Sequence, residues 1–226
     1  MTPSHRLLDV PLFARLSPAV LDRLATNSPI RRYPAGQILC VEGDPGDSLI
    51  VLEVGQLRIS RVTVSGDQAV LAVIEPPAAV GELALLDGAP RDATVTAQRA
   101  VSVRLVPRGA FLDLIRQEPA AVEGLLRTLA GLVRAGNVRH ADVLGLDVPG
   151  RLAKWLLARA AGQREPALDG MRLVLGRSQG ELAAELGTTR STLNRALHDF
   201  EDLGLLTVDG DRVIVHQPEA LRAYAT

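Results

Sequence analysis

Hydrophobic and polar positions change their period twice along the chain. Residues 5–28 carry apolar side chains at helical spacing, which predicts an N-terminal helix. Ser17 caps a helix whose first position is Pro18, a typical helix start. From residue 30 to about residue 106 the apolar positions form short runs, separated mostly by glycine or proline. The predicted strands are 38–41, 48–52, 56–59, 69–74, 93–97 and 101–105. Short strands with regular turn signals predict a sandwich or barrel.

Residues 108–145 return to helical spacing. A short helix ends at Glu118–Pro119, and a longer helix continues to about Leu144. Its apolar stripe consists of Val122, Leu125, Leu126, Leu129, Leu132, Val133 and Val138. Such a stripe is typical of a helix that pairs with its copy in a dimer, and it also fits a helix that covers its own β-domain. Asp147–Gly150 places proline beside glycine and predicts a hinge.

Residues 178–200 predict two short helices around a tight turn. Ser178 and Glu181 form a capping box at the start of the first helix, and Gly187 permits the turn. Thr189 caps the second helix. The buried face of that helix follows the i, i+3, i+4, i+7 spacing and consists of Leu193, Ala196, Leu197 and Phe200. Two apolar runs around Asp209–Gly210 then predict a hairpin, which would form a wing.

The opposite face of the second helix is polar and basic. It carries Arg190, Ser191, Asn194, Arg195 and His198. Arginine binds guanine and asparagine binds adenine through paired hydrogen bonds in the major groove, so this face predicts DNA reading. Arg177 and Thr188 are candidates for phosphate contacts, which position the protein on the duplex. The alternative is an ordinary solvated helix face, but this face carries no acid before Asp199.

Composition narrows the class of protein. The chain has 226 residues, is 47% hydrophobic and only 3% aromatic, so leucine, valine, alanine and isoleucine must build its cores. A net charge of -1 restricts any DNA-binding surface to a local patch. Cys40 is the only cysteine, which excludes an internal disulfide and a cluster with four thiolate ligands. The four histidines lack metal-ligand spacing. Without a signal peptide or a membrane-spanning run, we expect a cytoplasmic protein with no membrane partner.

A second candidate site lies upstream of the DNA reader, in residues 80–85 and 91–95. Glu82 supplies a carboxylate and Arg91 a guanidinium, both close to Gly81. A cyclic nucleotide needs such a set, because its ribose hydroxyl requires an acceptor and its phosphate a bidentate donor. A surface ion pair at a loop is the alternative. A small-molecule pocket upstream of a DNA reader predicts a ligand-gated transcription regulator.

In combination, these motifs resemble the Crp/Fnr family of bacterial transcription regulators over nearly the full chain. Residues 39–55 are similar to its β-roll motif, 80–91 to its phosphate-binding cassette, and 190–195 to the start of its recognition helix. Residues 147–151 are similar to the hinge of its cyclic-AMP receptors, especially actinobacterial ones. The resemblance implies an α+β fold with four parts. They are a jelly-roll-like, cyclic-nucleotide-binding β-roll domain with an N-terminal helix (1–118), a dimerisation helix (119–146), a hinge (147–150) and a winged helix-turn-helix (151–226).

The resemblance also implies a set of residue roles. Glu82 would hold the ribose hydroxyl and Arg91 the cyclic phosphate, while Gly81 lets the backbone approach the ligand. Leu83 belongs to the same cassette. Asn137, on the dimer helix, would hydrogen-bond the adenine amino group. The implied effector is cyclic AMP, with no cofactor required, and the implied partners are a second copy of the chain, a palindromic DNA operator and RNA polymerase.

Three positions depart from the family pattern. Asp92 places a carboxylate beside the phosphate site, where it repels a phosphate unless it points away, or pairs with Arg91. Gly136 replaces a polar purine contact. Ser191 stands where many members have a glutamate that accepts from cytosine, so we predict a different operator preference.

Several alternatives stay open beside a regulator controlled by cyclic AMP. One is a regulator that is active without a cyclic nucleotide or that answers to another effector. The lack of a cysteine quartet argues against the oxygen-sensing branch, and the lack of a histidine near the expected haem position weakens the gas-sensing branch. An enzyme with a nucleotide-binding regulatory domain is another alternative. Only about eighty residues follow the hinge, which leaves too little chain for a catalytic domain beside the helix-turn-helix, and they contain no nucleophile–base pair and no Walker-type loop. We therefore predict no enzyme activity. A purely structural dimer module is the last alternative.

Overall fold

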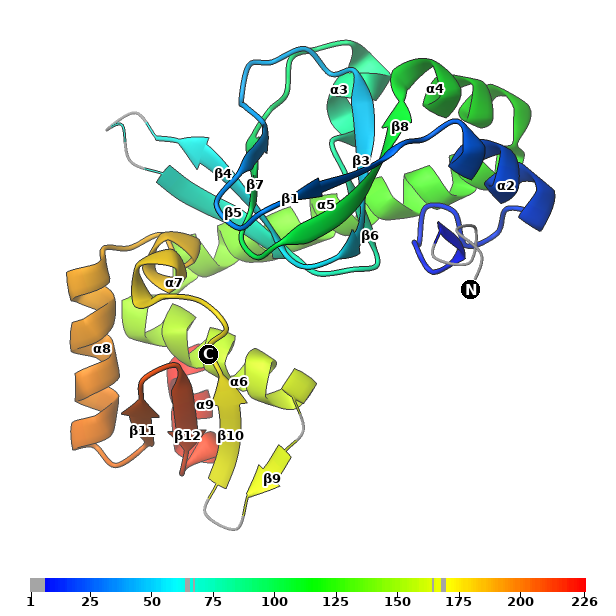
Figure 1. Cartoon of the computed structure of the whole chain (residues 1–226). Helices are drawn as coiled ribbons and strands as arrows, with labels where there is room; N and C mark the ends of the chain where they lie inside the picture. Colours follow the sequence, from blue (N-terminus) through cyan, green and yellow to red (C-terminus); the bar gives the residue numbers. More distant parts are fainter. Residues whose placement is uncertain (1–6, 64–65, 67, 164, 168–169) are drawn as a thin grey trace. The chain divides into compact units, whose positions relative to one another are not determined.

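The computed structural model describes residues 7–63, 66, 68–163, 165–167 and 170–226 (Figure 1). It divides into two compact units, Met1–Arg134 and Ala135–Thr226. The boundary between them falls inside the long helix α5 (Pro119–Gly145). Within the described residues, no helix combines the length and the apolar character needed to cross a bilayer.

The first unit is built on two antiparallel four-stranded sheets. One sheet has the order β1 (Ile30–Tyr33), β8 (Val101–Pro107), β3 (Ser48–Val54) and β6 (Ala78–Val80). The other has the order β2 (Ile38–Cys40), β7 (Thr94–Ala97), β4 (Leu57–Val62) and β5 (Gln68–Ile74).

Side chains alternate between the two faces of strand β3, and residues on both faces are buried. Ile50 and Leu52 join the core between the two sheets. Leu49 and Val51 point to the other side and pack with the helices.

Helices of the first unit cover one side of the β1-β8-β3-β6 sheet (Figure 1). They are α2 (Pro18–Thr26), α3 (Glu82–Asp87), α4 (Arg108–Gln117) and the first part of α5. The predicted N-cap of α2 is confirmed, since the Ser17 hydroxyl accepts the Val20 N–H at 3.4 Å. The predicted helix end at Glu118 is also confirmed.

The second unit contains a sheet of order β11 (Leu206–Asp209), β12 (Arg212–Val215), β10 (Gly170–Val174) and β9 (Glu165–Ala167). Its helices are the last turns of α5, then α6 (Val148–Gln163), α7 (Gln179–Glu185), α8 (Arg190–Asp202), α9 (Pro218–Arg222) and the 3-10 turn η1 (Ala223–Ala225). One core joins these elements, with Leu156 of α6, Leu197 and Phe200 of α8 and Val213 of β12 among its buried members. The predicted hairpin is confirmed, and Gly210 in its turn has φ +62°.

The α+β fold class predicted from the sequence is confirmed: the first unit is rich in β-strands, a long helix follows, and a helix-turn-helix lies near the C-terminus. The predicted strands correspond to β2, β3, β4, β5, β7 and β8. Strands β1, β6 and β9 and helices α3 and α9 were not predicted. The predicted hinge, 147–150, is mostly helical, because Val148, Pro149 and Gly150 form the first turn of α6. The residues between α5 and α6 outside any helix are only Leu146 and Asp147. Asp147 Oδ1 accepts the Gly150 N–H at 2.8 Å, which satisfies a free donor of that turn.

Candidate functional site

The centre of the upstream site is the guanidinium of Arg91. Its side chain is only 4% exposed. Nη1 donates to the Gly81 carbonyl at 2.9 Å and Nη2 to the Ser48 carbonyl at 2.5 Å. Nη2 also lies 3.5 Å from Oδ1 of Asp47, whose side chain is 85% exposed. Backbone carbonyls from two segments far apart in sequence therefore fix the orientation of Arg91.

One hydrogen-bond donor of Arg91, its Nε, is buried and has no hydrogen-bond partner among the described residues. A buried N–H without an acceptor costs free energy, and more so when it belongs to a charged group. The arrangement thus suits an additional acceptor at Arg91, and an anionic oxygen is the strongest acceptor for a guanidinium.

Glycines allow the backbone to close around this arginine. Gly81 has φ +88°, and a Cβ built on it would lie 2.2 Å from Arg91 Nη1. A Cβ on Gly46 would lie 2.5 Å from the Cβ of Ala84 in α3. Real side chains do not approach so closely, so both positions require glycine for this packing.

Glu82 is the first residue of α3 and is buried, with 6% of its surface exposed. Burial raises the pKa of its carboxyl, and the nearby charge of Asp92 raises that pKa further. The backbone N–H groups of Glu82 and Gly81 and the charge of Arg91 act in the opposite direction. Glu82 and Arg91 thus belong to one electrostatic cluster.

Asp92 and Leu83 are both exposed at this cassette. The sequence left open whether Asp92 pairs with Arg91. Among the described residues, Arg91 forms its ion pair with Asp47 and not with Asp92. Asp47 and Ser48 were missed from the sequence. Asp47 lies within residues 39–55, the stretch similar to the β-roll motif. The carbonyl of Ser48 leaves no signature in a side-chain pattern.

Asn137 and Gly136 lie on the part of α5 that belongs to the second unit. Asn137 is exposed, and Gly136 is half-buried with open space where a side chain would start. A contact between Asn137 and a nucleotide stays a prediction.

The helix-turn-helix of the second unit has the predicted local geometry. Glu181 N–H donates to Ser178 Oγ at 3.2 Å, and Ser178 N–H donates back to Glu181 Oε2 at 2.9 Å, which confirms the capping box. Gly187 has φ +64° in the turn. Thr189 caps α8 by accepting the Thr192 N–H at 3.2 Å. The four apolar residues predicted for the inner face of α8 are all buried.

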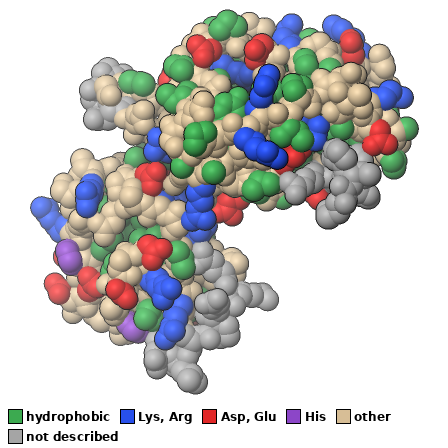
Figure 2. Space-filling model, in the orientation of Figure 1, with side chains coloured by type: hydrophobic (Ala, Val, Ile, Leu, Met, Phe, Trp, Pro, Cys, Tyr) green, Lys and Arg blue, Asp and Glu red, His purple; other side chains and the backbone are tan. Residues whose placement is uncertain are grey.

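The outer face of α8 presents most of the predicted reading residues. Arg190, Ser191, Arg195 and His198 are exposed, while Asn194 is half-buried. The Oδ1 atom of Asn194 is shielded from solvent and has no partner within the described part of the chain. His198 Nδ1 lies 3.3 Å from Glu201 Oε2. Figure 2 shows basic, acidic and histidine side chains mixed on the side of this unit where α8 lies.

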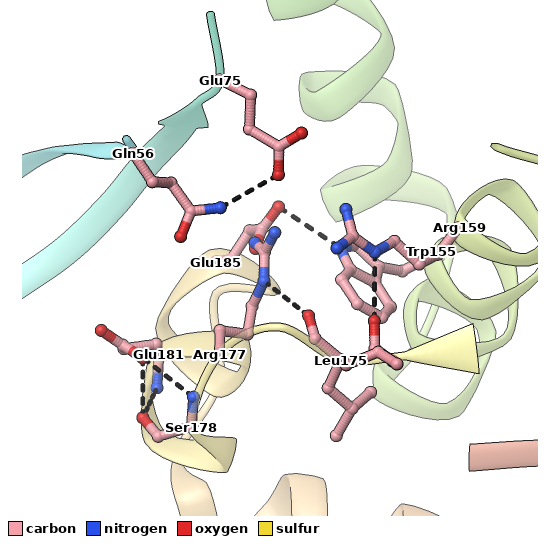
Figure 3. A network of polar contacts seen from close by, with 10 residues as sticks. Gln56, Glu75, Trp155, Arg159, Leu175, Arg177, Ser178, Glu181 and Glu185 are labelled. Atoms are coloured by element: carbon pink, nitrogen blue, oxygen red, sulfur yellow. Dashed lines mark hydrogen bonds and ion pairs between the residues drawn. The ribbon is translucent and has the colours of Figure 1, made fainter. Parts of the chain in front are cut away.

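Arg177 is turned inward in the second unit (Figure 3). Its side chain is 6% exposed, forms an ion pair with Glu185, and lies over the Trp155 ring at 5.2 Å from the ring centroid. Trp155 Nε1 donates to the other oxygen of Glu185 at 3.3 Å. A phosphate contact by Arg177 therefore requires this ion pair to open. Thr188 is half-buried, and its backbone N–H donates to the Ala183 carbonyl at 2.9 Å.

Comparison with known proteins identifies the family. Residues 30–118 match the model of the cyclic nucleotide-binding domain, and residues 150–224 match that of the Crp-like helix-turn-helix domain. The CRP-like cAMP-activated global transcriptional regulator of Mycobacterium tuberculosis is 34% identical over 215 residues, covering 93% of this chain and 94% of that protein. The chain belongs to the Crp/Fnr family. It is thus a DNA-binding transcription regulator with a cyclic nucleotide-binding domain, as the sequence predicted.

The chain is also similar to a further relative and to solved structures. The cyclic AMP receptor protein of Thermus thermophilus is 28% identical over 215 residues, covering 95% of this chain and 96% of that protein. The solved structure of the catabolite activator protein of that organism has a TM-score of 0.55 at 28% identity and covers 95% of this chain and 98% of its own. A CooA mutant from Carboxydothermus hydrogenoformans has a TM-score of 0.80 at 20% identity, with 98% and 96% coverage, and shows the shared fold alone.

Proposed function

We propose that the protein is a homodimeric regulator that binds a palindromic operator and is controlled by cyclic AMP held in its first unit. The observation that carries the effector site is the buried Arg91, whose Nε lacks a partner among the described residues. An additional anionic acceptor at this guanidinium fits the phosphate of a cyclic nucleotide.

The other cassette residues fit the same ligand. Glu82 would accept a hydrogen bond from the ribose hydroxyl, and Gly81 keeps the backbone close to Arg91. Leu83 would cover the ligand with an apolar side chain, and Asn137 would contact the base. Asp47 and Asp92 are the unfavourable neighbours, since their negative charges oppose a phosphate. The expected affinity is thus lower than that of a cassette without these acids.

DNA reading is assigned to α8. Arg190, Asn194 and Arg195 would bind base edges, with Ser191 as a weaker reader and His198 as a further candidate. Thr188 would hold a phosphate, and so would Arg177 once released from Glu185. Two copies of α8 on one face of DNA need centres about 34 Å apart, and cyclic AMP would favour the dimer state with that spacing.

Dimerisation is assigned to α5. Its exposed large apolar side chains are Leu126, Leu132, Val133, Val138, Val143 and Leu144, each at least 47% exposed. A second copy of the helix would bury such side chains. RNA polymerase is the expected partner at a promoter, on the strength of family membership.

Calorimetric titration with cyclic AMP tests the effector. We expect heat of binding with the wild type and none with Arg91→Ala. The matched control is Arg99→Ala, which removes an exposed arginine of the same unit and should bind like the wild type. Equal binding by wild type and Arg91→Ala would contradict the assignment.

A second candidate is a regulator that does not need cyclic AMP. Two observations favour it: Asp47 already pairs with Arg91 at 3.5 Å, and Gly136 has no side chain to contact a purine. Thermal melting with cyclic AMP and with cyclic GMP separates the two. A shift with cyclic GMP alone would assign the other nucleotide, and no shift with either would support ligand-free activity.

A further inference from the structure

Two residues outside any helix, Leu146 and Asp147, separate α5 from α6, and polar contacts span this break. Arg151, in the first turns of α6, donates from Nη1 to the Leu146 carbonyl at 2.7 Å. Its Nε donates to the Leu186 carbonyl at 2.9 Å, at the end of α7. One guanidinium therefore connects the end of α5, the start of α6 and the turn of the helix-turn-helix.

Lys154 forms the second connection across the same break. Its Nζ lies 2.5 Å from Oδ1 of Asp142, in the last turn of α5. The two side chains are 42% and 22% exposed, so both are partly shielded from water and the pair is less screened than one on an open surface. Because Asp142 and Lys154 belong to different helices, their contact restricts how α6 can rotate on α5.

The residue type at position 154 is itself unusual. Lys154 is the only lysine in the chain, and the other basic residues that make up the 25 are arginines. An ammonium is a compact point charge on a flexible stem, whereas a guanidinium is a planar fork. A compact cation suits a contact with a single carboxylate oxygen, which is the contact that Asp142 offers here.

Movement of α6 is transmitted to the reading helix through the core. Leu152, Ala153 and Leu156 of α6 are buried in the same cluster as Leu193 and Leu197 of α8. A close-packed core resists shear, so α8 follows the orientation of α6.

We propose that Lys154 is a positioning residue for DNA binding. Its ion pair with Asp142 sets the orientation of α6, and thereby of α8, relative to the last turns of α5. The inference rests on the proposed function in one respect only, since it requires that α8 reads DNA. It does not depend on the identity of the effector.

A double-mutant cycle on DNA affinity tests this role. The probe is a duplex selected from a random library by the wild-type full chain, and affinity is measured by fluorescence anisotropy without nucleotide and with saturating cyclic AMP. We expect Lys154→Met and Asp142→Asn each to change the dissociation constant by about threefold or more in at least one condition. The double variant should be no worse than either single one, and the exchanged pair Lys154→Asp with Asp142→Lys should return affinity to within about twofold of wild type.

Two controls separate positioning from loss of folding. Glu219→Gln removes another ion-pair acceptor of the second unit, the partner of Arg222 on α9, and should leave affinity unchanged. Thermal melting of every variant shows whether it is folded.

Chemical modification gives a separate measure of the ion pair. Because Lys154 is the only lysine, an amine-selective acetylating reagent modifies only this side chain and the N-terminal amine. Asp142→Asn should make this lysine react faster.

The outcomes are distinct. Additive effects of the two single changes, wild-type affinity in both, or no recovery in the exchanged pair would overturn the role of Lys154 while leaving the proposed function intact. A wild-type protein that selects no duplex would overturn the proposed DNA reading, and the positioning role with it. A wild-type protein that binds DNA but ignores cyclic AMP would overturn the effector assignment alone, and the cycle would still decide the role of Lys154.

Discussion

Gly81 and Arg91 are in such close contact that no side chain fits between them, since a Cβ on Gly81 would lie 2.2 Å from Arg91 Nη1. Gly81→Ala should therefore move the guanidinium and abolish cyclic AMP binding, as well as lowering stability. Gly36→Ala is the matched control, because Gly36 has a similar φ, +84°, but no atom within 4 Å of the built Cβ.

The control separates backbone strain from displacement of the arginine. Alanine at positive φ costs roughly 1 kcal/mol, and overpacking adds about 1–3 kcal/mol at Gly81 only. Chemical denaturation and calorimetric titration measure the two effects. If both variants lost the same stability and bound cyclic AMP equally, the contact with Arg91 would be unimportant.

Glu82 should make the stability of the protein depend on pH. Burial raises the pKa of its carboxyl in the folded state, so the folded protein holds this proton more tightly than the unfolded chain does. The contribution of Glu82 to stability is then greatest at acid pH and is lost as the pH rises through the folded-state pKa. We expect Glu82→Gln to be more stable than wild type at neutral pH and to converge with it in acid.

Glu123→Gln provides a control of opposite sign. A hydrogen bond from Arg127, together with the charge of Arg15, lowers the pKa of Glu123. The stabilisation by Glu123 is present at neutral pH and is lost as the pH falls through its folded-state pKa. This variant should be less stable than wild type at neutral pH and should converge with it in acid. Melting temperatures measured between acid and neutral pH decide both cases, and the same sign for the two variants would contradict the argument.

The buried ion pair of Arg104 and Glu53 should be a main support of the first unit. Their side chains are 3% and 6% exposed, and Arg104 Nε lies 2.9 Å from Glu53 Oε1. Arg104 Nη1 also donates to the Ala25 and Ser28 carbonyls, each at 3.0 Å, which ties the end of α2 to β8. Arg104→Met should cost about 3–5 kcal/mol in the free energy of unfolding, because it leaves Glu53 charged and buried.

Arg116→Met tests whether this cost reflects burial. Arg116 pairs with Asp113 at 3.1 Å, but both side chains are more than half exposed, 71% and 62%. An exposed pair contributes at most about 1 kcal/mol, so this variant should unfold almost like the wild type. Urea denaturation compares them, and similar losses for the two variants would argue against a special role for the buried pair.

Features of this structure that depend on neighbouring residues were predicted from the sequence, whereas several that depend on contacts between distant residues were missed. The caps by Ser17, Ser178 and Thr189 depend on hydrogen bonds within three residues, which a short sequence window contains. Strand β1 was missed because Ile30–Tyr33 is mostly exposed and lacks the alternation of a half-buried strand. It exists because it pairs with β8, which lies far along the chain.

The same difference between local and distant contacts explains which residues of the candidate site were predicted. Glu82 and Arg91 were found because their side chains carry the chemistry of the motif. The partners that orient Arg91 were not found, because one is the carbonyl of Ser48, 43 residues away, and every residue has a carbonyl. The inward position of Arg177 was also hidden, since its pairing with Glu185 depends on the fold of α7. The sequence therefore identified the side chains expected to bind the ligand, and not the backbone groups that position them.

Charge placed on the exposed face of α5 should separate the proposed dimer. Val133 is 63% exposed in the single chain. Val133→Glu would place a carboxylate against its copy in a paired helix, where desolvation and like-charge repulsion oppose association. Ala135→Glu adds the same charge roughly on the opposite side of the helix, at about 100° per residue. Sedimentation velocity should show a monomer for the first variant and a dimer for the second. Two dimers would exclude this face as the interface.

Arg195 of α8 should contribute to sequence reading rather than to general attraction. It is exposed on the same helix as the buried Leu193 and Leu197, so its position is fixed by the core. Arg195→Ala should weaken binding to the selected duplex by about 1–3 kcal/mol and relax the preference at one base pair in each half-site. Arg222→Ala removes an exposed arginine on α9 and should retain both affinity and preference. Affinity measured over a set of single-base variants and several salt concentrations gives the answer. A uniform loss on every sequence, with a shallower salt dependence, would instead identify Arg195 as a phosphate contact.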